Sequence, residues 1–551
     1  MSDHGTGMID RGSRIGRATK RDRAEPRPAD PEDGHGGRRL FASGVVLGVA
    51  LLSTAGGCGN ESAGPEPPGG GPDGPGSGSF AIGVVGGRQE DQVRDVAIDA
   101  QGNLYLSGVT RSDDFPVTSG AYQTEFNPGT RTVGGTEADA FVVKLSASGE
   151  LLWSTLVGGP HHDRTYGMEV DDQGFVYIAG RAGPGFPTTA GVLQPQFGGG
   201  SDDPPYGPQD GYVCKLAPDG ASVVFCTYFG GSDNRIVRDI VVDDRGDIYI
   251  ASARESGTYP ASIAGAFTNG TRGDIDAVLA KISSDGSRVL WATYLGGSGR
   301  EGNTNSVRLD AAGNPYFIYG SSSCDIPEIG AGAAQPTCGG GGDIIVSRLD
   351  PVSGAVVWST YLGGSGNEGL ETHELAVAAD GTVFVAAGTS SSQDFPIVGN
   401  VFQTSHGGGT LDIFVARISS DGSTLEAATL LGGSENDDAQ GIAVNAAGDV
   451  FLTGSTRSDD FPVTAARAVQ PDYGDGRDMV AVRLSPGLDR LIYSSFLGGG
   501  QEERGRAAAV RGDLFLFGGA TESSNWPSRG GALSVPGGQL DAAFGAVTIP
   551  D

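Results

Sequence analysis

Short runs in which apolar and polar residues alternate cover the chain from residue 80 onward, separated by turn residues. In the first unit, two alternating runs, 93–98 and 104–110, flank a turn, and a long loop with an aromatic–proline pair follows. An Asp-led run, 139–145, and a run entering a Gly-Gly pair, 153–159, complete the unit. Alternation with a period of two predicts β-strands, and no helical periodicity competes over a comparable length. Each unit is therefore predicted to contain four antiparallel strands.

This unit recurs along the chain. Its Gly-Gly pair appears at spacings of 66 to 72 residues, beginning at Gly86, Gly158, Gly230, Gly296, Gly363, Gly432 and Gly498. Four-stranded units of this size, read seven times, predict an all-β fold, a seven-bladed β-propeller of four-stranded antiparallel blades. The last unit stops after its third strand, and an orphan run, 80–85, precedes the first Gly-Gly pair. We expect this run to complete the last blade, which closes the ring and removes its exposed edges.

The repeated phrases resemble those of a known family. STYLGGS, VDxxGNxY, SxDFP and DAFVxKL are together similar to the seven-bladed β-propeller (SBBP) repeats of bacterial exported proteins, from about residue 80 to the end. Blade 2 departs from the pattern with GFP at 185–187 and an insertion around 202–207, and blade 7 has Asn-Trp-Pro at 525–527. The resemblance implies a propeller fold and an exported location. It implies no single activity whose residues could be carried over to this chain.

The N-terminal part of the chain has the pattern of a targeting segment. A polar stretch ends in Arg38-Arg39, and the apolar run 40–52 is shorter than the roughly 20 residues that cross a bilayer. Residues 1–57 are therefore predicted to be a signal peptide. Ala-Gly-Gly at 55–57 resembles a bacterial lipobox, which implies cleavage before Cys58 and acylation of its thiol. The alternative is ordinary signal-peptidase cleavage nearby, with Cys58 incidental.

Residues 58–79 comprise Cys58 and a stretch rich in Gly, Pro and Ser with almost no apolar side chain, which predicts a flexible tether between Cys58 and a propeller domain at 80–551. A lipid anchor on a tether predicts an exported protein held in the bacterial envelope, at the outer membrane or the cell surface. The membrane would be contacted only through that anchor.

Charge and composition limit the classes of partner and cofactor that the protein could bind. The formal net charge is −30, from 37 Lys and Arg against 67 Asp and Glu, so the surface repels nucleic acid and anionic lipid. Six His and five Cys are too few for a transition-metal cluster in so long a chain, whereas the acids are numerous enough for calcium. No cofactor is predicted apart from that candidate ion. The sequence has no G-x-S-x-G motif, which would carry the nucleophilic serine of a hydrolase triad, so such a triad is not predicted.

One Asp begins the third strand of every unit. These residues are Asp139, Asp210, Asp276, Asp343, Asp412, Asp478 and Asp541. They could coordinate calcium, or they could accept backbone N–H bonds from a neighbouring loop and fix each blade entry. One acid per blade is sparse for an ion that needs 6 to 8 oxygens, which favours the structural role. Further acids follow the Gly-Gly links, and we interpret these, like the pair His161-His162, as solvated surface groups.

The remaining cysteines fall into two pairs. Cys324 and Cys338 bracket one long loop, and a disulfide between them would staple it in an exported compartment. Cys214 and Cys226 lie on the third and fourth strands of blade 2, at similar distances from the turn between them. They are predicted to be cross-strand neighbours, either bonded to one another or present as buried free thiols.

Strand order places the tight turns on one rim of the ring, here called the tight-turn rim. The long loops and the blade-to-blade links lie on the other, the long-loop rim, where binding residues are expected. The leading hypothesis is a non-catalytic, monomeric cell-envelope lipoprotein that binds a protein or glycan through its long-loop rim. A calcium-stabilised structural propeller and an extracytoplasmic glycan lyase or hydrolase are the alternatives. A non-repeating His, Arg or Tyr in a polar pocket at the axis would favour the enzyme.

Overall fold

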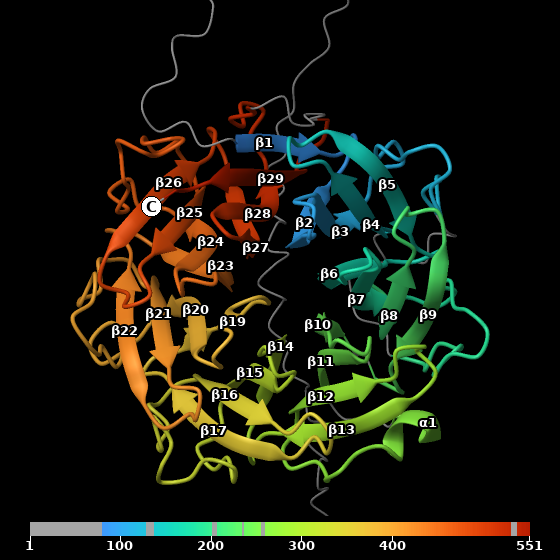
Figure 1. The fold of residues 1–551 in the computed structure, drawn as a ribbon, viewed down its shortest axis with the longest axis horizontal. Helices are drawn as coiled ribbons and strands as arrows, with labels where there is room; N and C mark the ends of the chain where they lie inside the picture. The colour runs from blue at the N-terminus through green and yellow to red at the C-terminus, as the bar shows by residue number, and fades with distance from the viewer. Residues whose placement is uncertain are drawn as a thin grey trace, which may run out of the picture. The chain divides into compact units, whose positions relative to one another are not determined.

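The computed structural model describes residues 80–127, 137–200, 206–233, 236–254, 259–529 and 537–550. The predicted signal peptide (1–57), Cys58 and the tether (58–79) lie outside the described residues. The described strands form seven antiparallel sheets arranged as the blades of a ring, which confirms the predicted all-β propeller (Figure 1).

The strands of each blade are given from the axis outward. Blade 1 has β2 (Asp91–Ile98), β3 (Leu104–Thr110), β4 (Asp139–Leu145) and β5 (Leu151–Val157). Blade 2 has β6 (Arg164–Val170), β7 (Val176–Ala182), β8 (Asp210–Leu216) and β9 (Val223–Phe229). Blade 3 has β10 (Val237–Val242), β11 (Ile248–Arg254), β12 (Asp276–Ile282) and β13 (Val289–Leu295). Blade 4 has β14 (Glu301–Leu309), β15 (Pro315–Ser321), β16 (Asp343–Leu349) and β17 (Val356–Leu362).

The innermost strand of blade 5 is interrupted. That blade has β18 (Glu368–Gly369) and β19 (Leu375–Val377), both paired with β20 (Val383–Thr389), followed by β21 (Asp412–Ile418) and β22 (Leu425–Leu431). Blade 6 has β23 (Asp437–Val444), β24 (Val450–Thr456), β25 (Asp478–Leu484) and β26 (Leu491–Leu497). Blade 7 has β27 (Glu503–Arg511), β28 (Leu514–Thr521), β29 (Asp541–Thr548) and β1 (Phe80–Val85). The helix α1 (Ala261–Ala264) is a single turn outside β13 (Figure 1).

The ring is joined within blade 7, where the first described strand meets the last. β1 pairs antiparallel with β29, in a register that runs from Phe80 opposite Val547 to Val85 opposite Ala542. The side chains of Ile82 and Val85 are fully buried. The edge that β29 would otherwise expose is therefore covered by a segment from the opposite end of the sequence.

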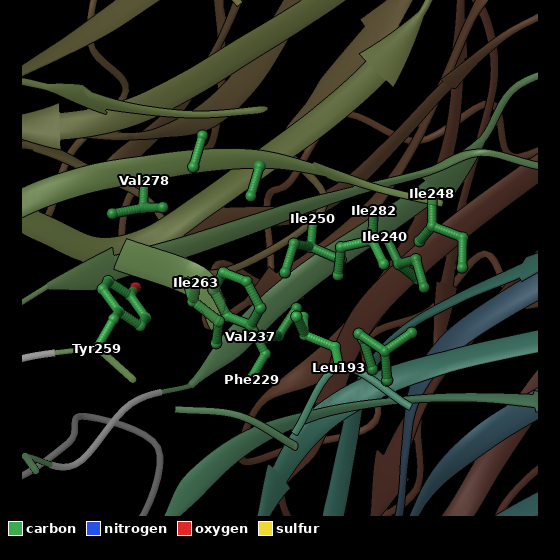
Figure 2. Close-up of a cluster of buried hydrophobic side chains, with 14 of the residues drawn as sticks. Leu193, Phe229, Val237, Ile240, Ile248, Ile250, Tyr259, Ile263, Val278 and Ile282 are labelled. Atoms are coloured by element: carbon green, nitrogen blue, oxygen red, sulfur yellow. The ribbon is translucent and has the colours of Figure 1, made fainter. Parts of the chain in front are cut away.

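The hydrophobic core lies between neighbouring blades. Every residue of β3, β7 and β20 is buried, because each blade has a neighbour against both of its faces. Figure 2 shows one such interface, in which Phe229 of blade 2 lies with Ile250 and Val278 of blade 3. Interfaces of this kind repeat around the ring, so the propeller is held together by contacts between sheets.

The long loops do not crowd the long-loop rim, and the prediction is wrong in that respect. They leave from it, but in blades 1, 2, 4 and 5 the middle of the loop crosses the outer wall and bonds to a tight turn of the next blade. The backbone N–H groups of Tyr122, Leu193, Ala334 and Phe402 donate to the carbonyls of Gly220, Gly286, Gly422 and Leu488 respectively, at 2.8 to 2.9 Å. Apolar loop residues such as Leu193 and Ile263 fill the groove between blades, and their burial favours this path (Figure 2).

Both cysteine pairs are bonded. Cys214 and Cys226 face one another across β8 and β9 and form a disulfide. Cys324 and Cys338 form a second disulfide within the loop between β15 and β16. Among the described residues, no helix has the length and apolarity that crossing a bilayer would require.

The closing strand offers a direct test of ring stability. Ile82→Ala removes a fully buried side chain from β1, and we expect it to lower the free energy of unfolding by about 2 to 5 kcal/mol. Leu152→Ala on β5 is the control, because that side chain is 48% exposed and should change stability by less than about 0.5 kcal/mol. Chemical denaturation measures both. Equal effects would mean that β1 contributes no packing.

Candidate functional site

The seven repeats differ most where they line the axis. In five innermost strands the pairing register shifts by one residue, which leaves Arg94, Tyr166, Arg238, Gln440 and Arg506 outside the regular ladder. Asn305 follows the irregular stretch of β14, and His373 lies in the gap between β18 and β19. Register shifts of this kind redirect a side chain and often accompany functional sites. The axis therefore carries seven different polar positions in a fold whose blades are otherwise alike.

Four arginines from three blades surround one tyrosine ring near the long-loop rim. The guanidinium carbons of Arg94, Arg164, Arg181 and Arg238 lie 5.1, 4.8, 5.6 and 4.4 Å from the ring centre of Tyr166. None of the four arginines is more than 2% exposed. The Tyr166 hydroxyl is buried and has no hydrogen-bond partner among the described residues. We call this group the arginine cluster.

The long loop of blade 2 covers the cluster. The Tyr206 ring centre lies 3.6 Å from the Arg181 guanidinium carbon and 4.9 Å from the ring centre of His162. His162 is only 2% exposed, so the interpretation of His161-His162 as a surface pair is wrong for its second member. The predicted insertion of blade 2, around 202–207, includes Tyr206, and its residues 202–205 lie outside the described chain. The described part of the blade 2 insertion thus contacts the arginine cluster through Tyr206.

His373 reaches across the axis from blade 5 to blade 2. Its Nε2 lies 2.9 Å from the carbonyl oxygen of Tyr166 and 3.7 Å from Asp95 Oδ1, while its Nδ1 lies 3.7 Å from Asp239 Oδ1. Arg308 donates to Asp239 Oδ2 at 2.5 Å. This axial ion network ties five blades together, blades 1 to 5, beneath the arginine cluster.

Burial and neighbouring charges set the protonation of this network. Desolvation raises the pKa of Asp95, although the charge of His373 acts in the opposite direction. Desolvation would also lower the pKa of Arg308, but the carboxylates of Asp239 and Asp95 outweigh it, and that pKa is raised. Arg308 is therefore the fixed positive charge of the network.

The oxygen and nitrogen atoms of Asp95, Asp239 and His373 lie within 4.8 Å of one another, a spacing that would suit a metal ion. The carboxylate oxygens, however, already accept hydrogen bonds. Asp95 accepts from the N–H groups of Val96 and Met168, at 2.8 and 2.6 Å, and Asp239 Oδ2 accepts from Ser306, Val307 and Arg308. These donors occupy the positions that a metal ion would need, so the triad fits an ion network better than a metal centre.

The seven Asp residues singled out in the sequence lie at the long-loop rim, away from the axis. Each accepts at least one backbone N–H from the loop before its strand. The donors to Asp139, Asp210, Asp276, Asp343, Asp412, Asp478 and Asp541 include Asn127, Gly198, Gly273, Gly339, Gly407, Gly474 and Gly537 respectively. Burial raises the pKa of Asp139 and of Asp478 to about 7.

The acids after the Gly-Gly links are not a solvated rim, and that interpretation is wrong. Asp91, Asp163, Glu301, Glu368, Asp437 and Glu503 are all buried. Their carboxylates turn inward because they accept the N–H of the second link glycine, as in Gly87 to Asp91 at 2.7 Å, or hydroxyl donors, as in Ser391 to Glu368 at 2.6 Å. Burial raises the pKa of Asp91 to about 7.

Two repeated features escaped the sequence analysis. A loop glutamine in five blades accepts the N–H of the first link glycine through its Oε1, and these residues are Gln123, Gln194, Gln335, Gln403 and Gln470. The axial ring was also missed. Aligning the units on their Gly-Gly pairs would have found most of the axial positions, because Arg94, Tyr166, Arg238, Gln440 and Arg506 each lie 8 residues after the first link glycine. The glutamines lie 28 to 36 residues before that glycine, so differences in loop length hide them from such an alignment.

Comparisons with known proteins leave the family open. No family model matches the chain. Regulatory protein FlaEY of Caulobacter vibrioides is 24% identical over 348 residues, which are 57% of this chain and 35% of that protein. The chain thus spans about a third of the length of that relative.

Similar solved structures include three chains. They are hydrazine synthase of Kuenenia stuttgartiensis (11% identity, 78% of this chain and 93% of that chain, TM-score 0.41), the WD40 β-propeller domain of Doa1 (10%, 84% and 96%, 0.38) and quinohemoprotein alcohol dehydrogenase of Comamonas testosteroni (10%, 86% and 77%, 0.35). Likeness at this level concerns the fold at most and carries no activity to this chain. The fold rests on the sheets described above.

The axial ion network can be tested by mutation. Arg308→Gln leaves Asp239 buried without its cation, and we expect the free energy of unfolding to fall by about 3 kcal/mol or more. Arg490→Gln removes one exposed arginine from the tight-turn rim and should change stability by less than about 0.5 kcal/mol. Urea denaturation of both variants gives the comparison. A loss for Arg308→Gln no greater than for the control would contradict the network.

Proposed function

We propose that this protein is an exported, lipid-anchored scaffold of the bacterial cell envelope that binds a carboxylate group of a protein or glycan partner. The site is the arginine cluster, at the long-loop end of the axis. One observation carries the proposal: four buried guanidinium groups gather around Tyr166 in a chain whose net charge is −30. Cys58, the signal peptide and the resemblance to SBBP repeats support the location and remain predictions.

The chemistry of the cluster favours a carboxylate. A guanidinium group is planar, always charged and able to donate two parallel hydrogen bonds to one carboxylate. The Tyr166 hydroxyl adds a buried donor that has no partner among the described residues. Because the rest of the surface is acidic, a polyanion would be repelled at long range. The proposed ligand is therefore an isolated acidic group, such as one uronate or one acidic side chain.

Access to the cluster requires a movement of the blade 2 loop. The arginines are buried, and Tyr206 lies directly over Arg181. Loops can shift on binding where the scaffold beneath them is rigid. Displacement of the Tyr206 side chain would open the cluster toward the long-loop rim.

A glycan lyase is the second candidate, and the same residues favour it. Arginines that neutralise a uronate would make its neighbouring carbon more acidic, and a tyrosine hydroxyl among them would be placed to exchange the proton. Tyr166 meets this description, and it is the kind of non-repeating axial residue that the enzyme hypothesis requires.

Binding can be tested with the full-length protein and matched ligands. We expect it to bind oligosaccharides with one uronic acid, or peptides with one acidic side chain, and not to bind the corresponding neutral ligands. Calorimetry measures the affinities. Tyr166→Phe removes only the hydroxyl and should weaken binding about tenfold, which corresponds to about 1.4 kcal/mol. Arg490→Gln, on the opposite rim, should leave the affinity unchanged.

The outcomes separate the candidates. Equal binding of acidic and neutral ligands, or an unchanged affinity in Tyr166→Phe, would exclude the arginine cluster as the site. Release of unsaturated sugar, followed by its ultraviolet absorbance, would select the lyase if Tyr166→Phe abolished it.

A further inference from the structure

The side chain that fills the groove between two blades is missing at one junction. The loop residue whose N–H bonds to a tight turn of the next blade is Tyr122 in blade 1, Leu193 in blade 2 and Phe402 in blade 5. Each of these side chains packs against a hydrophobic cluster between two blades. Blade 4 has Ala334 at this position, and its N–H bonds to the Gly422 carbonyl at 2.9 Å. The loop thus follows the same path, but the bulky side chain is absent.

A groove of about 450 Å³ opens beside Ala334. Its lining comes from the loop of blade 4 and from the loop and outermost hairpin of blade 5, and includes the apolar residues Pro396, Val398 and Leu425. Ligand sites in proteins typically measure about 300 to 1,000 Å³. Because a tyrosine, leucine or phenylalanine side chain occupies the corresponding place at other junctions, the groove suits an apolar side chain of that size.

The tryptophan beside this junction is also less covered than its counterparts. Trp358 lies opposite Arg348 in the pairing of β16 with β17, and it is half-buried. Its Nε1 donates to the Ser420 carbonyl at 3.2 Å, in the tight turn that Ala334 contacts. The aromatic residues at the same strand position of four other blades are all buried, and they are Trp153, Phe225, Trp291 and Tyr493. Blade 4 therefore leaves apolar surface exposed where the other blades cover it.

The groove is flanked by negative charge. Asp394 belongs to its lining, is exposed, and has no ion-pair partner in the described part of the chain. The corresponding Asp114 of blade 1 lies 2.9 Å from the guanidinium of Arg88. Asp421 is exposed as well and precedes the lining residue Ser423 by two positions. The lining residues, all of them described, include no Lys or Arg, so a ligand with a positive charge is favoured.

We propose that this groove binds a segment of a partner protein that inserts one bulky apolar side chain and places a Lys or Arg beside Asp394. The partner would supply the side chain that Ala334 lacks, and its basic group would neutralise a carboxylate that is paired in blade 1. A second copy of this chain is disfavoured as the occupant, because two chains with a net charge of −30 repel one another. The groove lies on the outer wall and is independent of the arginine cluster at the axis.

The test uses the full-length protein and short peptides that carry one Phe and one Arg at three different spacings. The peptides are acetylated and amidated, and they contain no carboxylate that the arginine cluster could bind. All four tryptophans are described and Trp358 is the one that is not buried, so acrylamide quenching of fluorescence reports on it. We expect at least one peptide to bind and to protect Trp358 from the quencher. Replacing its Phe by Ala, or its Arg by Gln, should weaken binding about tenfold or more.

Ala334→Leu is the blocking variant. It introduces the side chain that blade 2 carries at Leu193, so we expect the fold to be kept, Trp358 to be less accessible and the affinity for the peptide to fall about tenfold or more. Ala312→Leu is the matched control, because Ala312 is exposed in the turn between β14 and β15 of the same blade. This variant should bind the peptide as the wild type does.

Asp394→Asn tests the charge separately. Its side chain is exposed and asparagine keeps an oxygen that can accept the Ser365 N–H, so the fold should be unaffected. The preference for the Arg peptide over the Gln peptide should disappear. If no peptide protects Trp358, or if Ala334→Leu binds as tightly as the wild type, the proposal is wrong. A dimer in light scattering that Ala334→Leu dissociates would assign the groove to a second copy and would also overturn it.

Discussion

The Gly-Gly link is the constraint on which the rest of the propeller depends. Each link must pass from the outer strand of one blade to the innermost strand of the next. Four links, at Gly86, Gly363, Gly432 and Gly498, lie against two carboxylates, and five links lie beside a loop glutamine. A side chain at Gly363 would collide with Asp343 and Glu368, so this position requires glycine. The acids and the glutamine in turn bond to link N–H groups, which fixes the spacing of the blades. The interfaces between sheets follow from that spacing.

The arrangement of side chains at the axis also depends on the regular spacing of the blades. Because the links place the innermost strands of different blades at the same height, one register shift per strand is enough to direct a side chain inward. The link contacts recur in most blades, whereas the residue at the shifted position differs between blades, as Arg94, Tyr166 and Gln440 show. The contacts that hold the fold together thus repeat around the ring, whereas the arginine cluster and His373 occur once.

The sequence predicted the strands because alternation and the Gly-Gly period were averaged over many copies. It also predicted the partners of Cys214 and Cys324, since strand register and loop boundaries followed from the same repeat. It failed where the outcome depended on three-dimensional proximity between blades. The acid after each link looks exposed in a polar stretch, and only the neighbouring blade buries it. The path of the long loops was missed for the same reason, because the groove that Leu193 fills lies between two blades.

The closing strand has one more consequence. β1 is the first described element after the predicted anchor, and its Phe80 end lies opposite Val547, at the tight-turn rim. Any tension transmitted along the chain before Phe80 acts first on the six residue pairs between β1 and β29. The pairing that closes the ring would then also be its mechanical joint, and pulling the protein away from its anchor would begin by peeling open blade 7.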